Sequence, residues 1–170
     1  MFSALMILMQ RKNFTDITIT ELVKKAGFSR MAFYRNYDTT LDVIVDFLEQ
    51  NPFGFDKNIR CEKYLLEKQT RKILQYLLEN KVLFENLTNA NLMYLFKNTL
   101  EKYFINEYLP AINNFGFFYK YDVALFINLY YEIIVNWAKK GMDEKKIDEV
   151  ITQAVGCLYK VKAQHRVCNI

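Results

Sequence analysis

Apolar residues recur along this chain at spacings of three and four, and strand-like alternation of apolar and polar residues is absent. Such spacing places apolar side chains on one face of a helix. Glycine and proline, which interrupt helices, number only 5 and 2 among 170 residues. Because 52% of the residues are hydrophobic, the chain can also bury a core. The sequence therefore predicts an all-α protein.

The first part of the chain carries start and stop signals for short helices. Thr18 and Glu21 have the spacing of a capping box, which predicts a helix start. Gly27 is suited to the left-handed conformation that ends a helix. Ser29 can cap another helix, which we expect to continue through Tyr37. Two short helices joined by a brief turn predict a helix-turn-helix.

Further helices are expected on both sides of this motif. A first helix should end near Lys12, and Thr39 and Asp42 repeat the capping pattern before a fourth helix that ends near Glu49. Asp143 is a further candidate cap. Longer helices are expected at 62–79, 82–87, 90–108, 121–139 and 145–162. We expect two domains, a three-helix module over residues 1–45 and a larger helical domain over 46–170.

Charge is unevenly distributed near the start of the chain. Six Lys and Arg residues face two acids over positions 1–37, whereas positions 38–50 carry four acids and no Lys or Arg. This polarity suits an anionic partner at one end of the molecule, although two solvated helix faces would give the same pattern.

The segment from Phe14 to Leu22, followed by AGFSRMAFYRNY from Ala26 to Tyr37, has a capped helix, an Ala-Gly-hydrophobic-Ser turn and a short helix with a central Tyr. This order resembles the DNA-binding module of the tetracycline-repressor (TetR) family. The matching residues are Ala26, Gly27, Ser29, Phe33, Tyr34 and Tyr37. Trp137 and Gly141 before a final amphipathic helix look like the regulatory-domain variant found in low-GC Gram-positive bacteria.

The resemblance implies a homodimeric, ligand-responsive transcriptional regulator, a repressor, that binds a palindromic DNA operator. It also implies a small-molecule pocket in each regulatory domain and a dimer interface made by the last two long helices. The apolar spacing of the last helix fits such an interface. The interface residues would be Ile147, Val150, Ile151, Ala154, Val155 and Leu158.

DNA recognition needs phosphate contacts for position and base contacts for sequence. Arg30 and Arg35 are candidate readers of bases or phosphates, because a guanidinium can donate twice to a guanine edge or a phosphate. Met31 and Ala32 offer apolar contact to thymine methyl groups. By match to the family, backbone contacts would come from Tyr34 and Asn36, and from Thr18 and Thr20, with Ser29 completing the set.

The effector pocket would be lined by a few of the aromatic residues of the second domain, most of which must be core. The candidates are Tyr76, Phe84, Tyr94 and Tyr130, with Asn91 as a polar anchor. An aromatic lining suggests an apolar or planar effector.

No feature of the sequence supports an enzyme. The one histidine, His165, lies in a polar tail, and there is no Gly-rich phosphate loop. Cys61, Cys157 and Cys168 are an odd number without CxxC spacing, which fits a reducing cytoplasm better than a disulfide framework or a zinc ribbon. No metal or cofactor is expected, and no apolar run has the length of a membrane span.

An adaptor that acts through a protein partner is the alternative function. Family members usually carry a Lys shortly after the recognition helix, where Thr40 stands here, and Asp38 adds an opposing charge. Both features reduce attraction to phosphate. A steep fall in DNA affinity with rising salt would distinguish the regulator from the adaptor.

Overall fold

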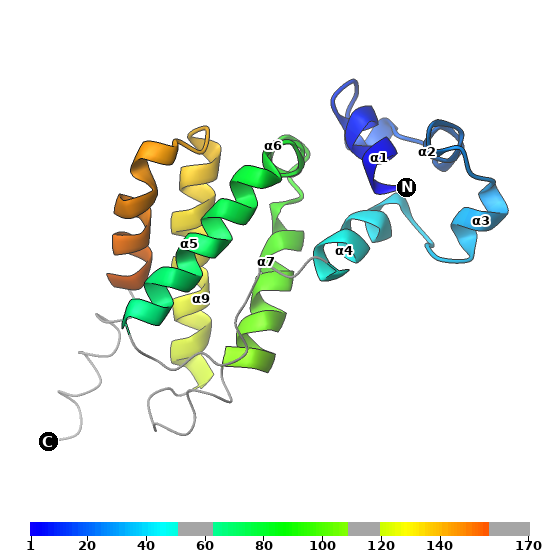
Figure 1. The fold of residues 1–170 in the computed structure, drawn as a ribbon. Coiled ribbons are helices and arrows are strands. Elements are labelled where there is room, and N and C mark those ends of the chain that lie inside the picture. Colours follow the sequence, from blue (N-terminus) through cyan, green and yellow to red (C-terminus); the bar gives the residue numbers. More distant parts are fainter. Residues whose placement is uncertain (51–62, 109–119, 157–170) are drawn as a thin grey trace, which may run out of the picture. The chain divides into compact units, whose positions relative to one another are not determined.

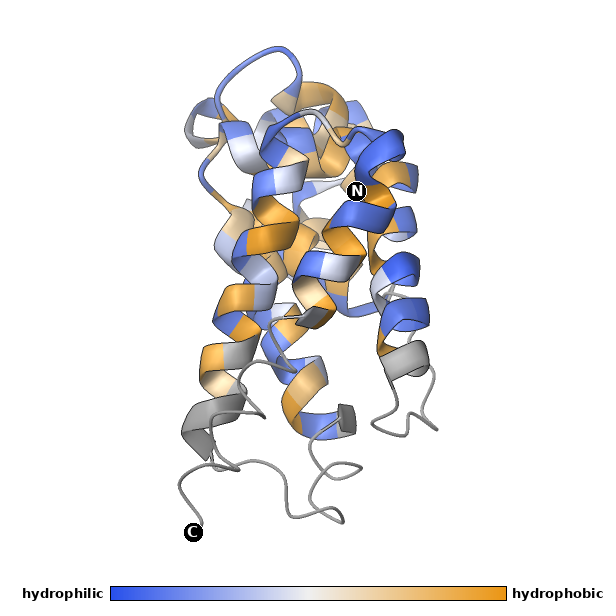
Figure 2. Ribbon diagram, turned by 90° about the vertical axis from the view of Figure 1, so that its left-hand side faces the viewer, coloured by the Kyte–Doolittle hydropathy of each residue, from blue (hydrophilic) through white to orange (hydrophobic). Residues whose placement is uncertain are grey.

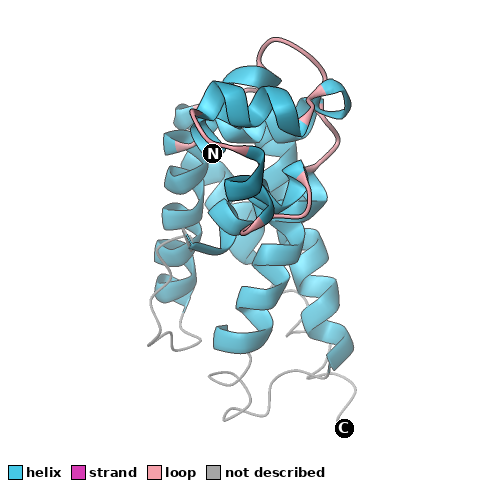
Figure 3. Cartoon of the chain, turned by 90° about the vertical axis from the view of Figure 1, so that its right-hand side faces the viewer, coloured by secondary structure: helices cyan, strands magenta, loops and turns pink. Residues whose placement is uncertain are grey.

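The computed structural model describes residues 1–50, 63–108 and 120–156, and every regular element in these ranges is a helix (Figure 1, Figure 3). The predicted all-α class is confirmed for this part of the chain. Cys61, Cys157, Leu158, His165 and Cys168 lie outside the described residues. None of the described helices is long and apolar enough to cross a membrane.

The first of two compact units contains the N-terminal helices. These are α1 (Phe2–Met9), a 3-10 turn (Phe14–Asp16), α2 (Ile19–Ala26), α3 (Arg30–Tyr34) and α4 (Thr40–Gln50). Helix α1 packs against α2 and α4, and α2 packs against α3. Val82–Phe96 belongs to the same unit. This segment holds most of α6 (Lys81–Asn89) and the first turn of α7 (Met93–Tyr103), so the unit is assembled from two separate parts of the sequence.

The core of the first unit follows the helical spacing of its apolar residues. Hydrophobic and hydrophilic positions, orange and blue in Figure 2, alternate along the helices of the protein. Five side chains from α1 to α4 are fully buried, namely Leu5, Leu22, Phe33, Ile44 and Leu48. The rings of Phe2 and Phe47 stack with centroids 3.6 Å apart and join α1 to α4. In the second segment Phe84 is fully buried and packs edge-on against Phe96, with ring centroids 5.1 Å apart.

The second unit contains the remaining helices. They are α5 (Lys63–Glu79), the rest of α7, a π-helical turn (Phe104–Tyr108), α9 (Lys120–Lys139), a 3-10 turn (Glu144–Lys146) and a helix at 147–156. Its core includes Ile73, Leu74, Leu77, Leu100, Ile134 and Ala154. An Arg71–Asp148 ion pair links α5 to the helix at 147–156. The predicted cap is confirmed, because the Asp143 carboxylate accepts a hydrogen bond from the Lys145 amide at 3.0 Å.

Several helix boundaries differ from the sequence expectation. The first helix ends at Met9 and not near Lys12, and the helix expected at 90–108 begins at Met93 and becomes π-helical after Tyr103. Helix α3 ends at Tyr34 instead of continuing through Tyr37. The Asn36 amide donates to the Phe33 carbonyl at 2.9 Å, three residues back, and the Asn36 side chain donates to the Ala32 carbonyl at 3.0 Å in place of the backbone amide. The Tyr37 amide still donates to the Phe33 carbonyl at 3.0 Å, but the regular α-helical pattern is broken at Asn36. Helix α6 extends to Asn89, beyond the expected end at position 87. Asn91 then adopts a left-handed backbone with φ of 58° and ends the run.

The residues expected at a dimer interface are already covered by their own chain. Val150, Ile151, Ala154 and Val155 are each less than 10% exposed in the single chain, and Ile147 is half-buried. The exposed face of the same helix carries Asp148, Glu149, Thr152 and Gln153. The apolar stripe of this helix therefore packs inside the second unit, and a charge placed at Val155 would fall in that core.

Replacing Phe84 should test whether α6 is part of the first core. Phe84→Ala should lower the free energy of unfolding by about 3–5 kcal/mol, because it removes a fully buried ring and leaves a cavity. Val82→Ala, at a position that is 44% exposed, should change stability by less than about 0.5 kcal/mol. Urea denaturation followed by circular dichroism measures both, and equal effects would contradict the assignment of Phe84 to the core.

Candidate nucleic-acid interface

The start of α2 is fixed by the predicted capping box. The Thr18 hydroxyl oxygen accepts a hydrogen bond from the Glu21 amide at 3.2 Å, and the Glu21 carboxylate accepts one from the Thr18 amide at 3.2 Å. The Thr18 hydroxyl also donates to that carboxylate at 3.0 Å. Gly27 ends the helix with φ of 72°, as expected for a left-handed cap. The hydroxyl proton of Thr18 is thus directed at Glu21 and away from any phosphate, whereas Thr20 is exposed.

Lys12 adds an ion pair to this box. Its ammonium group lies 2.6 Å from a Glu21 carboxylate oxygen and joins the chain that follows α1 to the first turn of α2. The hydrogen bond from Lys12, followed by those from Thr18, lowers the pKa of Glu21 from 4.5 to about 2. The box follows from local spacing, whereas Lys12, nine residues away, has no signature in that pattern.

Helix α3 has one buried side and one open side. The Ser29 hydroxyl oxygen accepts a hydrogen bond from the Ala32 amide at 3.1 Å and caps the helix, as predicted. Phe33 is fully buried and holds the helix against the unit. The residues predicted to contact DNA from this helix and its ends lie on the open side, with Ala32 half-buried and Ser29, Arg30, Met31, Tyr34, Arg35 and Asn36 exposed.

The polar groups on this open side differ in how they are held. The Arg30 guanidinium lies over the Tyr34 ring, 5.9 Å from the ring centroid, a geometry in which the cation is attracted to the aromatic face. Within the part of the chain that the structure describes, the Arg35 guanidinium has neither a hydrogen bond nor an ion pair. The Asn36 amide nitrogen donates to the Ala32 carbonyl, which leaves its oxygen as the outward group.

Tyr37 ties the end of α3 to α4. Its hydroxyl donates to the Asp46 carboxylate at 2.8 Å, and the Gln50 side chain donates to the other carboxylate oxygen at 2.6 Å. Burial, followed by the bond to Asp46, raises the pKa of Tyr37. The Tyr37 ring also contacts Phe33, with centroids 5.6 Å apart. No local sequence pattern pairs Asp46 or Gln50 with Tyr37, so these hydrogen bonds could not be predicted from the sequence.

One carboxylate near this surface, that of Asp42, accepts hydrogen bonds from backbone amides. Asp42 accepts hydrogen bonds from the Thr39 amide at 2.7 Å and the Asp38 amide at 3.0 Å. These bonds, that from Thr39 first, lower the pKa of Asp42. The predicted cap of α4 is thus confirmed. Asp38 itself is exposed beyond the end of α3, so one negative side chain does border the open side.

The predicted effector residues are divided between the two units. Tyr76 on α5 and Tyr130 on α9 belong to the second unit, and Phe84, Asn91 and Tyr94 belong to the first. Phe84 is core, Asn91 is exposed, and Tyr94 is 46% exposed. Burial raises the pKa of Tyr76 to about 12. The effector pocket stays a prediction.

Tyr130 is part of a buried polar chain. It is 2% exposed, and its hydroxyl donates to the Thr70 hydroxyl at 3.1 Å. Thr70 in turn donates to the Leu66 carbonyl at 2.8 Å. Burial raises the pKa of Tyr130. This chain joins α9 to α5 inside the second unit.

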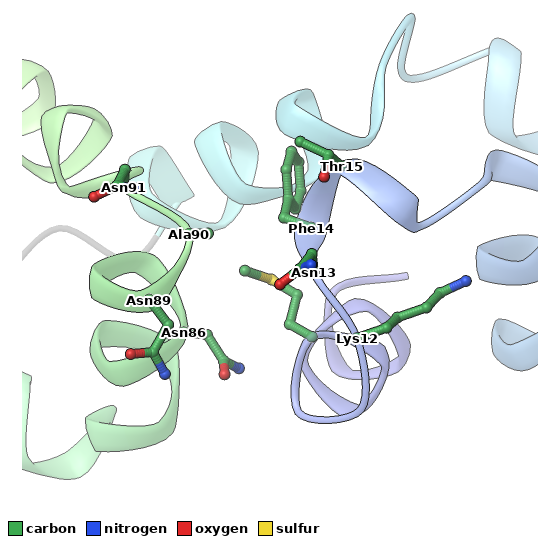
Figure 4. A pocket seen from close by; sticks show the side chains of 9 residues that line it. Lys12, Asn13, Phe14, Thr15, Asn86, Asn89, Ala90 and Asn91 are labelled. Atoms are coloured by element: carbon green, nitrogen blue, oxygen red, sulfur yellow. The ribbon is translucent and has the colours of Figure 1, made fainter.

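A cleft of about 240 Å³ in the first unit was not foreseen from the sequence. It lies between the segment from Lys12 to Thr15 and the end of α6, and Figure 4 shows the two sets of side chains. The lining residues are Met9, Lys12, Asn13, Phe14, Thr15, Asn86, Asn89, Ala90 and Asn91. Asn86 is 6% exposed and donates to the Met6 carbonyl at 3.4 Å. The cleft can hold a small polar molecule, and its amides come from two distant parts of the sequence.

The described residues contain no cluster of three or more His, Cys, Asp or Glu side chains that could hold a metal ion. Comparison of the sequence with models of known protein families and with curated proteins found no match. The geometry of the open side of α3 is therefore the basis for a functional assignment.

The stability contributed by Glu21 should depend on pH. Because the folded-state pKa of about 2 lies below the ordinary 4.5, this contribution is complete above about pH 4.5 and is lost as the pH falls toward 2. The stability difference between wild type and Glu21→Gln should therefore shrink over that interval. Urea denaturation from pH 6 to pH 2.5 measures it.

Glu144→Gln, which removes an exposed carboxyl from the second unit, is the matched control. A wild-type advantage over Glu21→Gln that is the same at pH 6 and pH 2.5 would contradict the role of Glu21.

Proposed function

We propose that this protein is a homodimeric, ligand-responsive transcriptional regulator that binds a palindromic operator through α2, the turn at Gly27 and α3. The observation that carries the proposal is the division of α3 into a buried anchor, Phe33, and an exposed outer surface. An isolated helix of five residues is not stable in water. The Ser29 cap, the buried ring of Phe33 and the Tyr37–Asp46 hydrogen bond stabilise α3 here. The exposed side of α3 can therefore contact a partner.

The charge of this surface favours DNA as the partner. Between positions 24 and 35 the chain has four cations, Lys24, Lys25, Arg30 and Arg35, and no carboxylate. All four side chains are exposed. Cationic groups beside a helix of this size suit a major groove, which is about 12 Å wide and admits an α-helix between two rows of phosphates. Phosphate contacts from such cations position a protein on the duplex.

A second copy of the chain is the partner that a palindromic operator requires, since a two-fold site is read by a two-fold protein. Val150, Ile151, Ala154 and Val155 are buried within the single chain, so we place the proposed contact on another helix face. Among the α9 side chains that the structure describes, Leu125 and Leu129 are large apolar side chains open to solvent, 52% and 39% exposed and four residues apart. We propose this face of α9 as the dimer contact.

The proposed effector is an apolar or planar small molecule bound in the second unit. Aromatic side chains from the π-helical turn after α7 and from α9 meet there, and the rings of Phe104 and Tyr130 make an edge-on contact with centroids 5.6 Å apart. A ligand can switch the protein only if it binds one arrangement of the recognition helices better than another. Tryptophan fluorescence of Trp137, which lies 4% exposed in α9, offers a readout of ligand binding in this unit.

An adaptor with weak direct DNA binding is the second candidate. Exposed Asp38 and the exposed apolar side chains Phe28 and Met31 favour it, because they suit a protein surface as well as DNA. Salt dependence separates the two functions. A regulator that neutralises several phosphates loses affinity steeply as salt rises, whereas an adaptor shows weak, sequence-indifferent DNA binding and a saturable protein partner.

Removal of the two arginines should weaken operator binding. Arg30→Ala and Arg35→Ala should each cost about 1–3 kcal/mol if the residue contacts the operator. Both side chains are exposed, so the fold should be retained. Gel-shift titration against DNA selected by the wild type is the measurement. A Lys139→Ala, Lys140→Ala variant removes two positive charges from the second unit, as the combined Arg30→Ala, Arg35→Ala variant does from the first, and should bind normally. Unchanged affinity of the arginine variants would refute the proposed interface.

Charges on α9 should dissociate the dimer. Leu125→Glu combined with Leu129→Glu should shift the mass in light scattering from that of two chains to that of one, with helix content unchanged. Thr152→Glu, on an exposed face of the helix at 147–156, should leave the dimer intact. Operator affinity should fall with the first variant, because two half-sites bound as one unit gain from effective concentration. The same mass for all three proteins would place the contact elsewhere.

A further inference from the structure

Large apolar side chains are unusually open around α3. Phe28 is 54% exposed, Tyr34 48% and Met31 72%, and Met31 is the most exposed of the large hydrophobic side chains in the ranges that the structure describes. Single exposed apolar residues are common on protein surfaces. Here three open apolar side chains fall within seven positions, bordered by four cations, and offer apolar contacts to a partner.

The direction of each side chain follows from the buried one. Successive residues in an α-helix are about 100° apart around its axis. Phe33 points inward, so the direction opposite to it is flanked by Met31 and Arg35. Arg35 retains helical dihedral angles, with φ of −70° and ψ of −23°. Met31 and Arg35, one turn apart, are therefore the side chains that extend furthest from the first unit along this helix.

The other arginine is held to one side. Arg30 lies over the Tyr34 ring and is about 100° removed from Met31 around the helix. This position suits a phosphate at the edge of the groove. On the opposite side, Asn36 is bonded to the Ala32 carbonyl. Residues on both flanks of α3 are thus held by contacts, whereas the Arg35 guanidinium has no hydrogen bond or ion pair to another described residue.

We infer that Met31 and Arg35 form a base-reading pair, in which Met31 contacts the C5-methyl group of a thymine and Arg35 donates to the edge of a nearby guanine. This inference rests on the proposed DNA-binding function and adds the chemistry of the operator half-site. Residues four apart on a helix have Cβ atoms about 5–6 Å apart. Base pairs rise about 3.4 Å per step, so the two contacts fall one or two steps apart.

The chemistry of the two side chains selects these two bases. In the major groove thymine alone among the unmodified bases presents a methyl group, and guanine presents two acceptors, N7 and O6, to a guanidinium. The methionine thioether is flexible and adapts to such a small apolar target. 5-Methylcytosine carries its methyl group at the equivalent ring position. If a cytosine replaces this thymine, methylation of that cytosine should therefore strengthen operator binding.

The test uses the full-length chain and a duplex that it selects from a random-sequence DNA library. Each thymine of the selected half-site is replaced by deoxyuridine, which removes only the methyl group. At one position per half-site, wild-type affinity should fall about fourfold for each methyl group lost, the ordinary worth of burying that group. Met31→Ala should be insensitive to this replacement, and Thr152→Ser, a conservative change at an exposed position of the second unit, should remain as sensitive as wild type.

Two further replacements test the same pair. Cytosine at the thymine position should weaken binding, and 5-methylcytosine should restore part of the affinity for wild type but not for Met31→Ala. Replacement of the nearby guanine by 7-deazaguanine, which lacks the N7 acceptor, should weaken wild type and leave Arg35→Ala unaffected. Circular dichroism confirms that each variant is folded.

The outcomes separate the inference from the function on which it rests. If the library yields no enriched sequence, or only a protein partner is bound, the proposed function and this inference both fail. If a sequence is enriched but wild type tolerates deoxyuridine at every thymine, the inference alone is overturned. Equal sensitivity of wild type and Met31→Ala, or of wild type and Arg35→Ala to 7-deazaguanine, also overturns it.

Discussion

The burial of Phe33 is the contact on which the presentation of α3 depends. Five residues cannot maintain a helix by their own hydrogen bonds, so this helix exists because its one inward ring is fully covered. The Ser29 cap sets where the helix begins, and the Tyr37–Asp46 bond sets where the chain goes next. With both ends fixed, the outward residues have a defined orientation. Their conformational freedom is already reduced before any partner binds.

The same logic extends through the rest of the first unit. The Lys12–Glu21 pair connects the chain after α1 to the start of α2, and stacking of Phe2 on Phe47 connects α1 to α4. Each contact joins two elements that are short by themselves. The unit is therefore stabilised by a set of pairwise contacts between helices, and the loss of one contact changes the orientation of the exposed side chains of α3.

The local features of the first unit could be predicted from the sequence, whereas the distant contacts could not. The capping boxes at Thr18 and Thr39, the left-handed Gly27 and the Ser29 cap involve residues within four positions of each other, where spacing alone defines the interaction. The end of α3 was placed three residues too late, because the bonds of Asn36 and Tyr37 have no signature in the local pattern.

Periodicity also fails to identify what covers an apolar face. The stripe through Val150, Ile151, Ala154 and Val155 has the spacing of an interface helix, and it is buried within a single chain. The same limit applies to the effector residues, since an aromatic at helical spacing can be core, as Phe84 is, or half-exposed, as Tyr94 is. Only the arrangement of helices in space distinguishes these cases.

The two segments of the first unit are synthesised at different times, because the second one comes later in the sequence. Its N-terminal helices are made first, but its partner segment Val82–Phe96 follows only after α5 has been translated. The nascent N-terminal helices therefore leave part of their apolar surface uncovered until Phe96 has emerged from the ribosome. A gene fragment that stops after α4 would encode the whole of α3 but not the segment Val82–Phe96 that completes this compact unit.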